Sequence, residues 1–158
     1  QYDVDIMKVI FMLAVHELGE IKIGDLTQFQ ISNSNKEKIE HQAVHEILKG
    51  LLDGDQIEAL FLEFDAHETK EALFAYQCDK LECDLQSSIY DDENCVDLND
   101  QEGNIILNNK LVSDLLKDGS SWSTMWLKFG QAVYPYDENF KDVSNYVLKR
   151  SLNNKDQQ

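Results

Sequence analysis

Side chains that could bind a metal or move protons fall at two places in the sequence. His16, Glu17, Glu20 and Asp25 lie within one ten-residue stretch, and Asp79 follows much later. Imidazole and carboxylate groups are ligands that suit Mn, Fe, Co, Ni or Zn. The two places therefore predict a divalent-metal site if the fold brings them together.

The first place lies at the end of an expected apolar helix. Hydrophobic residues at helical spacing predict one mostly buried helix over residues 3–20, which Gly24 and Asp25 then break. On that helix His16 and Glu20 lie four residues apart and share a face. Taken alone, the stretch is more typical of a core histidine with a satisfied hydrogen bond among solvated acids.

Asp79 favours the metal hypothesis over that plainer interpretation. It follows Phe74 and Tyr76 and precedes Leu81 in an expected long helix, and these apolar neighbours could draw it into the interior. A buried carboxylate needs a partner, and a metal ion is one that proteins use. The alternative is an ion pair with Lys80 or another base.

The rest of the chain also favours helices, so the expected class is all-α. Further helices are expected at about residues 36–52, 57–64, 70–90, 108–118, 121–133 and 137–151. Residues 91–104 indicate an irregular loop, and only Asn104–Leu107 has a weak strand pattern. The length of 158 residues predicts a single domain over 1–158, with its core at 3–90 and a C-terminal helical extension at 105–152.

Two other arrangements could also bind a metal. The segment from His16 to Glu20 resembles the zincin motif His-Glu-x-x-His, but Glu20 stands where the second zinc-binding histidine belongs. His41 and His45 lie four residues apart on an expected helix, yet that helix is strongly polar. A solvated face is therefore the favoured interpretation of the second pair.

The charge and the cysteines exclude several classes of protein. A net charge of −16 repels phosphates, so neither nucleic acid nor an anionic membrane is an expected partner. The three cysteines form no C-x-x-C pair, which favours a reducing cytoplasmic compartment over a zinc ribbon. No apolar run approaches the roughly 18–20 residues that a membrane span needs.

Several segments together resemble one known family, the HD-domain phosphohydrolases, and more narrowly its 5′-deoxynucleotidase-like branch. The resemblance covers residues 6 to about 90. The segments that carry it are His16-Glu17-x-x-Glu20, Gly24-Asp25, Glu40-x-x-Ala43, Glu63-Phe64, and the run from Ala72 through Asp79 to Glu82.

The resemblance implies a helical bundle with a four-ligand metal site. His16, Glu17 and Asp79 match three of the family's ligands, while Glu20 and Asp25 match residues that orient water or protonate the leaving group. Glu17 replaces the usual aspartate, and the family's first histidine has no counterpart before residue 6. Because the chain begins without Met and close to a helical pattern, we expect preceding residues, including an N-terminal helix or helices of the bundle.

The resemblance further implies an enzyme that hydrolyses the phosphomonoester of (deoxy)nucleoside 5′-monophosphates. The implied cofactor is a divalent ion, namely Mn, Co, Fe, Ni, Zn or Mg, and the implied partners are a small phosphorylated nucleotide and a second copy in a homodimer. A bound cation would also let a chain of −16 charge hold a phosphate. Two alternatives are a catalytically degenerate HD module that acts by association, and a nucleoside triphosphate or polyphosphate hydrolase.

Overall fold

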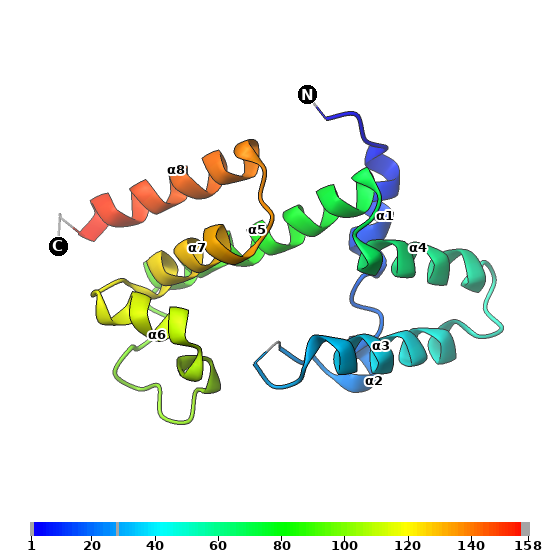
Figure 1. Cartoon of the computed structure of the whole chain (residues 1–158), viewed down its shortest axis with the longest axis horizontal. Helices are drawn as coiled ribbons and strands as arrows, with labels where there is room; N and C mark the ends of the chain where they lie inside the picture. The colour runs from blue at the N-terminus through cyan, green and yellow to red at the C-terminus, as the bar shows by residue number, and fades with distance from the viewer. Residues whose placement is uncertain (1, 28, 156–158) are drawn as a thin grey trace. The chain divides into compact units, whose positions relative to one another are not determined.

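The structure is a computed structural model that describes residues 2–27 and 29–155, and all regular elements in these ranges are helical (Figure 1). This confirms the all-α prediction. The elements are α1 (Ile6–Val15), α2 (Glu20–Ile23), α3 (Asn33–Leu48), α4 (Gly54–Ala66), α5 (Lys70–Asp92), the 3-10 helix η1 (Ile105–Asn108), α6 (Lys110–Lys117), α7 (Trp122–Val133) and α8 (Glu138–Lys155). No helix in the described part of the chain is both long and apolar enough to span a bilayer.

The chain divides into two compact units within α5. The N-terminal unit is Gln1–Tyr76 and the C-terminal unit is Gln77–Gln158. Each unit has its own buried residues, as a separately packed body should. The prediction of a single domain over 1–158, with its core at 3–90 and its extension at 105–152, stays a prediction.

The N-terminal unit packs α1 and α3 against α4, and α3 and α4 run antiparallel beside each other (Figure 1). One buried cluster joins α1 to α4 and to the start of α5, and a second joins α3 to α4. The first contains Val9, Met12, Phe64, Ala72 and Ala75, and the second contains Val44, Leu48 and Phe61. The two clusters fix α1 and α3 relative to α4, and hence position the side chains at their ends.

The expectation of one mostly buried helix over residues 3–20 is wrong. Asp5 caps α1 by accepting a hydrogen bond from the Lys8 backbone N–H at 3.1 Å, and α1 ends at Val15. A turn over residues 16–19 then leads into α2. Only one face of α1 is covered, so Ile10 is 52% exposed. The spacing of the apolar residues predicted a helix, but it could not show which of these side chains another helix would cover.

The other expected helices are present with shifted ends. The second begins earlier and ends earlier than 36–52, and the short helix expected at 57–64 extends to Gly54–Ala66. Gly54 is required at that start, because a Cβ there would lie 2.4 Å from the Leu48 carbonyl oxygen. The weak strand pattern at Asn104–Leu107 belongs to η1, which Asn104 caps by accepting from the Ile106 N–H.

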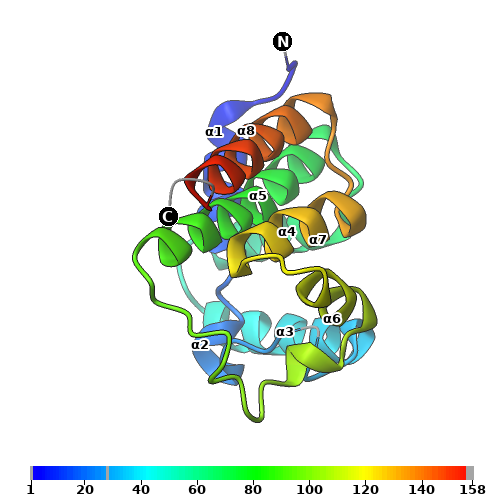
Figure 2. The ribbon, with the colours of Figure 1, turned by 90° about the vertical axis from the view of Figure 1, so that its left-hand side faces the viewer.

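The C-terminal unit packs α7 and α8 beside the later turns of α5, and α6 against α7 (Figure 2). Its buried apolar side chains are Leu81, Val112, Met125, Leu127, Phe129 and Phe140. Buried hydroxyls supply the cross-links: Ser123 donates to the Asp91 carboxylate at 2.7 Å, and Ser88 and Ser151 are 3.4 Å apart. Pro135 lies between α7 and α8, as expected from its effect on helices.

Candidate functional site

His16 is fixed in one orientation at the end of α1. It is the C-cap residue, and its ring packs against Phe64 with the ring centroids 5.0 Å apart. The Nδ1–H donates to the Leu13 carbonyl oxygen at 2.8 Å. A neutral ring held in this way carries its lone pair on Nε2, which is the tautomer of a metal-binding histidine with a backbone partner.

Glu17 lies beside that nitrogen but is open to solvent. Its Oε1 is 3.8 Å from His16 Nε2, and 68% of its side chain is exposed. Both residues lie in the turn that follows α1, not within the helix. The bend of the backbone in this turn brings the two side chains close to each other. The donor pair is one imidazole nitrogen and one carboxylate, which fits a divalent transition ion.

Gly19 allows the turn after His16 to pack closely on α3. It is buried, and a Cβ at this position would lie 3.2 Å from Glu40 Cβ. Such a contact is tighter than side chains normally accept. The glycine of the His-Glu-Leu-Gly-Glu segment therefore has a packing role, which brings Glu20 towards α3.

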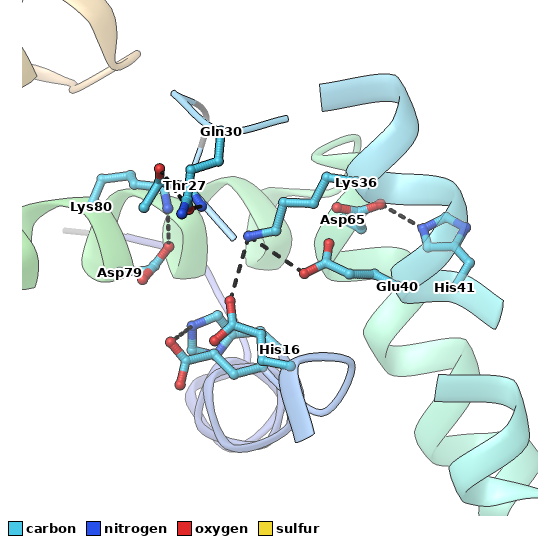
Figure 3. Close-up of polar contacts among 11 residues, drawn as sticks. His16, Thr27, Gln30, Lys36, Glu40, His41, Asp65, Asp79 and Lys80 are labelled. Carbon is cyan, nitrogen blue, oxygen red and sulfur yellow. Dashed lines mark hydrogen bonds and ion pairs between the residues drawn. The ribbon is translucent and has the colours of Figure 1, made fainter. Parts of the chain in front are cut away.

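Glu20, Lys36 and Glu40 form a cluster between α2 and α3. Lys36 Nζ is 3.4 Å from Glu20 Oε1 and 3.5 Å from Glu40 Oε1, and all three side chains are mostly buried (Figure 3). Burial raises the pKa of the Glu20 carboxyl, the nearby Asp25 charge raises it further, and Lys36 lowers it. Burial also raises the pKa of Glu40, and Lys36 opposes that shift. A carboxyl with a raised pKa keeps its proton closer to neutral pH and can act as an acid.

Asp25 follows the break that the sequence predicted. Gly24 closes α2 with a φ of 78°, in the left-handed region that glycine tolerates. Asp25 is exposed, and its charge contributes to the raised pKa of Glu20. The two predicted catalytic acids, Glu20 and Asp25, therefore lie close enough in the N-terminal unit for their charges to interact.

Asp79 lies on α5 in the C-terminal unit. Its side chain is 14% exposed, in agreement with the expectation that apolar neighbours draw it inward. Lys80 Nζ is 2.8 Å from Asp79 Oδ2, so the ion pair considered as an alternative is present. His16, Glu17, Glu20 and Asp25 belong to the other unit. The joint ligand set of His16, Glu17 and Asp79 therefore stays a prediction.

The sequence did not single out Lys36 and Glu40 as functional residues. Their signal was their spacing of four on one helix, which places a base and an acid on the same face. His41 and His45 do not share one acidic partner. His41 Nε2 is 2.7 Å from Asp65 Oδ2, and His45 Nδ1 is 3.1 Å from Glu58 Oε1. The polar helix they occupy is therefore only partly a solvated face.

Comparison with known proteins identifies the family of this chain. A model of the HD domain matches residues 1–117, and the chain belongs to the HD-domain family. The chain is 37% identical over 92 residues to 5′-deoxynucleotidase HDDC2 of Dictyostelium discoideum, which covers 56% of this chain and 48% of that protein. It is 32% identical over 84 residues to 5′-deoxynucleotidase hdd1 of Schizosaccharomyces pombe, which covers 49% of this chain and 42% of that protein.

The chain spans about half the length of the curated relatives it matches. No solved structure matches it.

Proposed function

We propose that this chain is a metal-dependent phosphohydrolase that cleaves the phosphomonoester of (deoxy)nucleoside 5′-monophosphates. Membership of the HD-domain family supports the reaction class, and the names of the two relatives support the substrate class. The single observation that carries the proposal is the His16 ring. Its Nδ1–H donates to the Leu13 carbonyl oxygen at 2.8 Å, and its Nε2 lies 3.8 Å from Glu17 Oε1.

We propose His16 Nε2 and the carboxylates of Glu17 and Asp79 as metal ligands, with a further histidine expected from the family pattern. The ion would be Mn, Co, Fe, Ni, Zn or Mg. When bound, such an ion lowers the pKa of a coordinated water and screens phosphate charge. Glutamate at position 17 is one methylene longer than the family's aspartate, and its exposed side chain has room to turn towards an ion.

Glu20 is the proposed acid of the reaction. Its pKa is raised by burial and by Asp25, so it holds a proton at a pH where an ordinary glutamate is ionised. That proton can pass to the departing ribose oxygen. Asp25 is exposed and would act through its charge and through bound water. Lys36 limits the rise in the pKa of Glu20 and thereby sets the pH at which the proton is released.

The test is phosphate release from nucleoside 5′-monophosphates with each candidate metal, using wild type and Asp79→Asn. Loss of a metal ligand should lower the rate by more than about 100-fold, since loss of an outer partner alone costs about 10–100-fold. Asp92→Asn is the matched control, because Asp92 lies on the same helix in an exposed pair with Arg150. Circular dichroism should show that both variants are folded. Full activity of Asp79→Asn would rule out the proposed ligand set.

The second candidate function is a non-enzymatic HD module. The Lys80–Asp79 ion pair favours it, because a lysine at 2.8 Å already neutralises the carboxylate that a metal would need. Metal content measured by mass spectrometry separates the two. Bound transition metal that is lost in His16→Asn, together with phosphate release, supports the enzyme, and absence of both supports the module. Release of pyrophosphate or triphosphate from nucleoside triphosphates would instead identify the third alternative. A homodimer and a cytoplasmic location stay predictions.

A further inference from the structure

A second group of metal-binding side chains lies between α3 and α4 and shares no residue with the proposed catalytic set. Glu37 and His41 are four apart on α3, and Asp65 is near the end of α4. One ligand atom from each lies within 4.8 Å of the other two. His41 Nε2 and Asp65 Oδ2 are 2.7 Å apart (Figure 3). It is the one such group of three among the residues described.

The distance between His41 and Asp65 suits a cation in place of the proton that now lies between His41 Nε2 and Asp65 Oδ2. Without an ion, the Nε2–H of His41 donates to Asp65. Around a tetrahedral zinc-like ion at about 2.1 Å, two ligand atoms stand about 3.4 Å apart. The His41–Asp65 contact of 2.7 Å must therefore open by about 0.7 Å. Binding would displace the Nε2 proton, and water could fill the remaining positions because Glu37 is exposed.

The surrounding charge also favours a cation. Asp65 and Glu20 both repel the negative charge of Glu40, and Lys36 is the cation that opposes this repulsion. Lys36 is engaged with Glu20 and Glu40 rather than with Asp65. The chain as a whole carries −16, which concentrates cations at its surface. A dication at Asp65 would relieve repulsion that extends to Glu40.

His41 is also held as a ligand should be. Its ring packs edge-on against Phe61, with centroids 5.8 Å apart, and 34% of its side chain is exposed. Phe61 itself is buried in the α3–α4 cluster. The imidazole therefore has a ring contact that fixes its direction and enough exposure for an ion to reach it.

We propose that Glu37, His41 and Asp65 form a second site for a divalent transition ion, which clips α3 to α4 within the N-terminal unit. One imidazole and two carboxylates select Co²⁺, Ni²⁺ or Zn²⁺ over Mg²⁺ or Ca²⁺, which bind through oxygen alone. The site is structural or regulatory, since no part of the proposed reaction uses these residues.

The same pair of helices supplies a matched control. His45 also lies on α3 and also faces an acid of α4, with 3.1 Å between His45 Nδ1 and Glu58 Oε1. Within the described residues this pair belongs to no group of three possible ligands. His41→Asn and His45→Asn thus each remove one imidazole and one interhelical contact, but only the first removes a proposed ligand.

The experiment is a Co²⁺ titration of the whole chain by calorimetry, with the visible spectrum recorded in parallel. A thiolate ligand would add an intense charge-transfer band, which distinguishes binding at the cysteines. The background is His16→Asn, so that the proposed catalytic site does not contribute. We expect one equivalent bound in this background and in its combination with His45→Asn. Adding His41→Asn should weaken that binding at least tenfold, as should adding the exposed Glu37→Gln.

Thermal unfolding gives a second measurement. Ligands that bind only the folded state raise the unfolding temperature, so Co²⁺ should stabilise the His16→Asn/His45→Asn chain and not the His16→Asn/His41→Asn chain. Equal Co²⁺ affinity in these two chains would overturn the proposal, as would no binding in the His16→Asn background. If the His41→Asn chain does not fold, the His16→Asn/Glu37→Gln chain replaces it. Equal Co²⁺ affinity in that chain and in the His16→Asn/His45→Asn chain would then overturn the proposal.

Discussion

The two compact units hold their partly and fully buried polar side chains in different ways. In the N-terminal unit, charged groups meet charged groups: Lys36 lies between Glu20 and Glu40, and His41 faces Asp65. In the C-terminal unit Asp79 also pairs with Lys80, but the fully buried polar groups are mainly hydroxyls, and the buried acid Asp84 accepts its hydrogen bond from the Tyr136 hydroxyl at 2.9 Å. The first arrangement pairs opposite charges, whereas the second uses hydroxyl groups to fix packing.

This difference shows what a nearby cation does for a buried carboxylate. Burial raises the pKa of Asp84 to about 7, and the Tyr136 hydrogen bond and the Lys80 charge only partly oppose it. Glu20 and Glu40 also have raised pKa values, but each has Lys36 within 3.5 Å. Asp84 is also more deeply buried, at 2% exposed against 22% for the Glu20 side chain and 14% for that of Glu40, so desolvation accounts for part of the difference.

The largest predicted effect is on the pH dependence of stability, through Asp84. The pKa of Asp84 rises from its ordinary 3.8 to about 7 on folding. The folded state therefore binds the proton more tightly, so this stability is complete below pH 3.8 and is lost as the pH rises through 7. The loss is on the order of 4 kcal/mol. Asp84→Asn should remove this pH dependence from urea unfolding measured between pH 4 and pH 8.

The control for that measurement is Asp142→Asn, an exposed acid on α8 of the same unit. It should leave the wild-type pH dependence in place. If Asp84→Asn and wild type lose stability equally between pH 4 and pH 8, the buried acid is compensated as well as those of the N-terminal unit, and the contrast between the units fails.

The next largest effect concerns Gly130, whose missing side chain makes room for Asp84. A Cβ at Gly130 would lie 1.9 Å from Asp84 Oδ2. Helix propensity alone predicts that Gly130→Ala stabilises α7 by roughly 1 kcal/mol. The steric conflict predicts the opposite sign, with a loss of about 3 kcal/mol. Chemical unfolding measures the sign of the change in the free energy of unfolding. A stabilised variant would show that the Asp84 side chain can move away from the new methyl group.

These two residues also mark the limit of the sequence analysis. Helical periodicity predicted α5 and α7 nearly to their ends, because each has enough apolar positions to define a face. It did not predict that Asp84 would be buried, because the hydrogen bond that compensates this carboxylate comes from a distant part of the chain. Asp84 is 52 residues from Tyr136, so their contact has no local signal.

The candidate site divides along the same line. His16, Glu17, Glu20 and Asp25 were singled out because their order and spacing match the family's pattern, and the break at Gly24 was predicted because glycine marks turns. Lys36 was passed over because it is just one of several charged residues at the start of α3. Its role depends on Gly19 allowing α3 to approach, which is a tertiary contact rather than a spacing.

A smaller effect is predicted when the cation is removed from the N-terminal unit. Lys36→Met should raise the pKa values of Glu20 and Glu40 further, because Lys36 now lowers both. Their charge would then be less compensated, and stability at pH 8 should fall by about 2 kcal/mol. The loss should shrink towards pH 4, where both carboxyls are protonated. Carbon-13 NMR titration of the glutamate carboxyls measures the shifts directly.

Lys38→Met is the matched control, since Lys38 is exposed on the same helix. It should leave both carboxyl titrations unchanged. If the pKa values of Glu20 and Glu40 do not shift in Lys36→Met, these carboxyls interact with Lys36 less strongly than the distances indicate. Contact with solvent would then keep the two acids charged.

The smallest effect compares one helix cap from each unit. Ser121 caps α7 by accepting from the Thr124 backbone N–H at 3.2 Å, and it is buried. Ser32 occupies the same position before α3 but makes no side-chain capping bond and is exposed. Ser121→Ala should therefore reduce the free energy of unfolding by about 1 kcal/mol, and Ser32→Ala by a few tenths at most.

Urea unfolding of the Ser121→Ala and Ser32→Ala variants measures the loss in free energy of unfolding for one hydroxyl in each unit. If hydroxyls fix the packing of the C-terminal unit while charges serve the N-terminal unit, the two identical substitutions must differ in the stated order. Equal losses would mean that a serine at a helix start contributes the same whether or not its oxygen bonds to the backbone. The buried hydroxyls of α7 would then fill space rather than hold the helix in place.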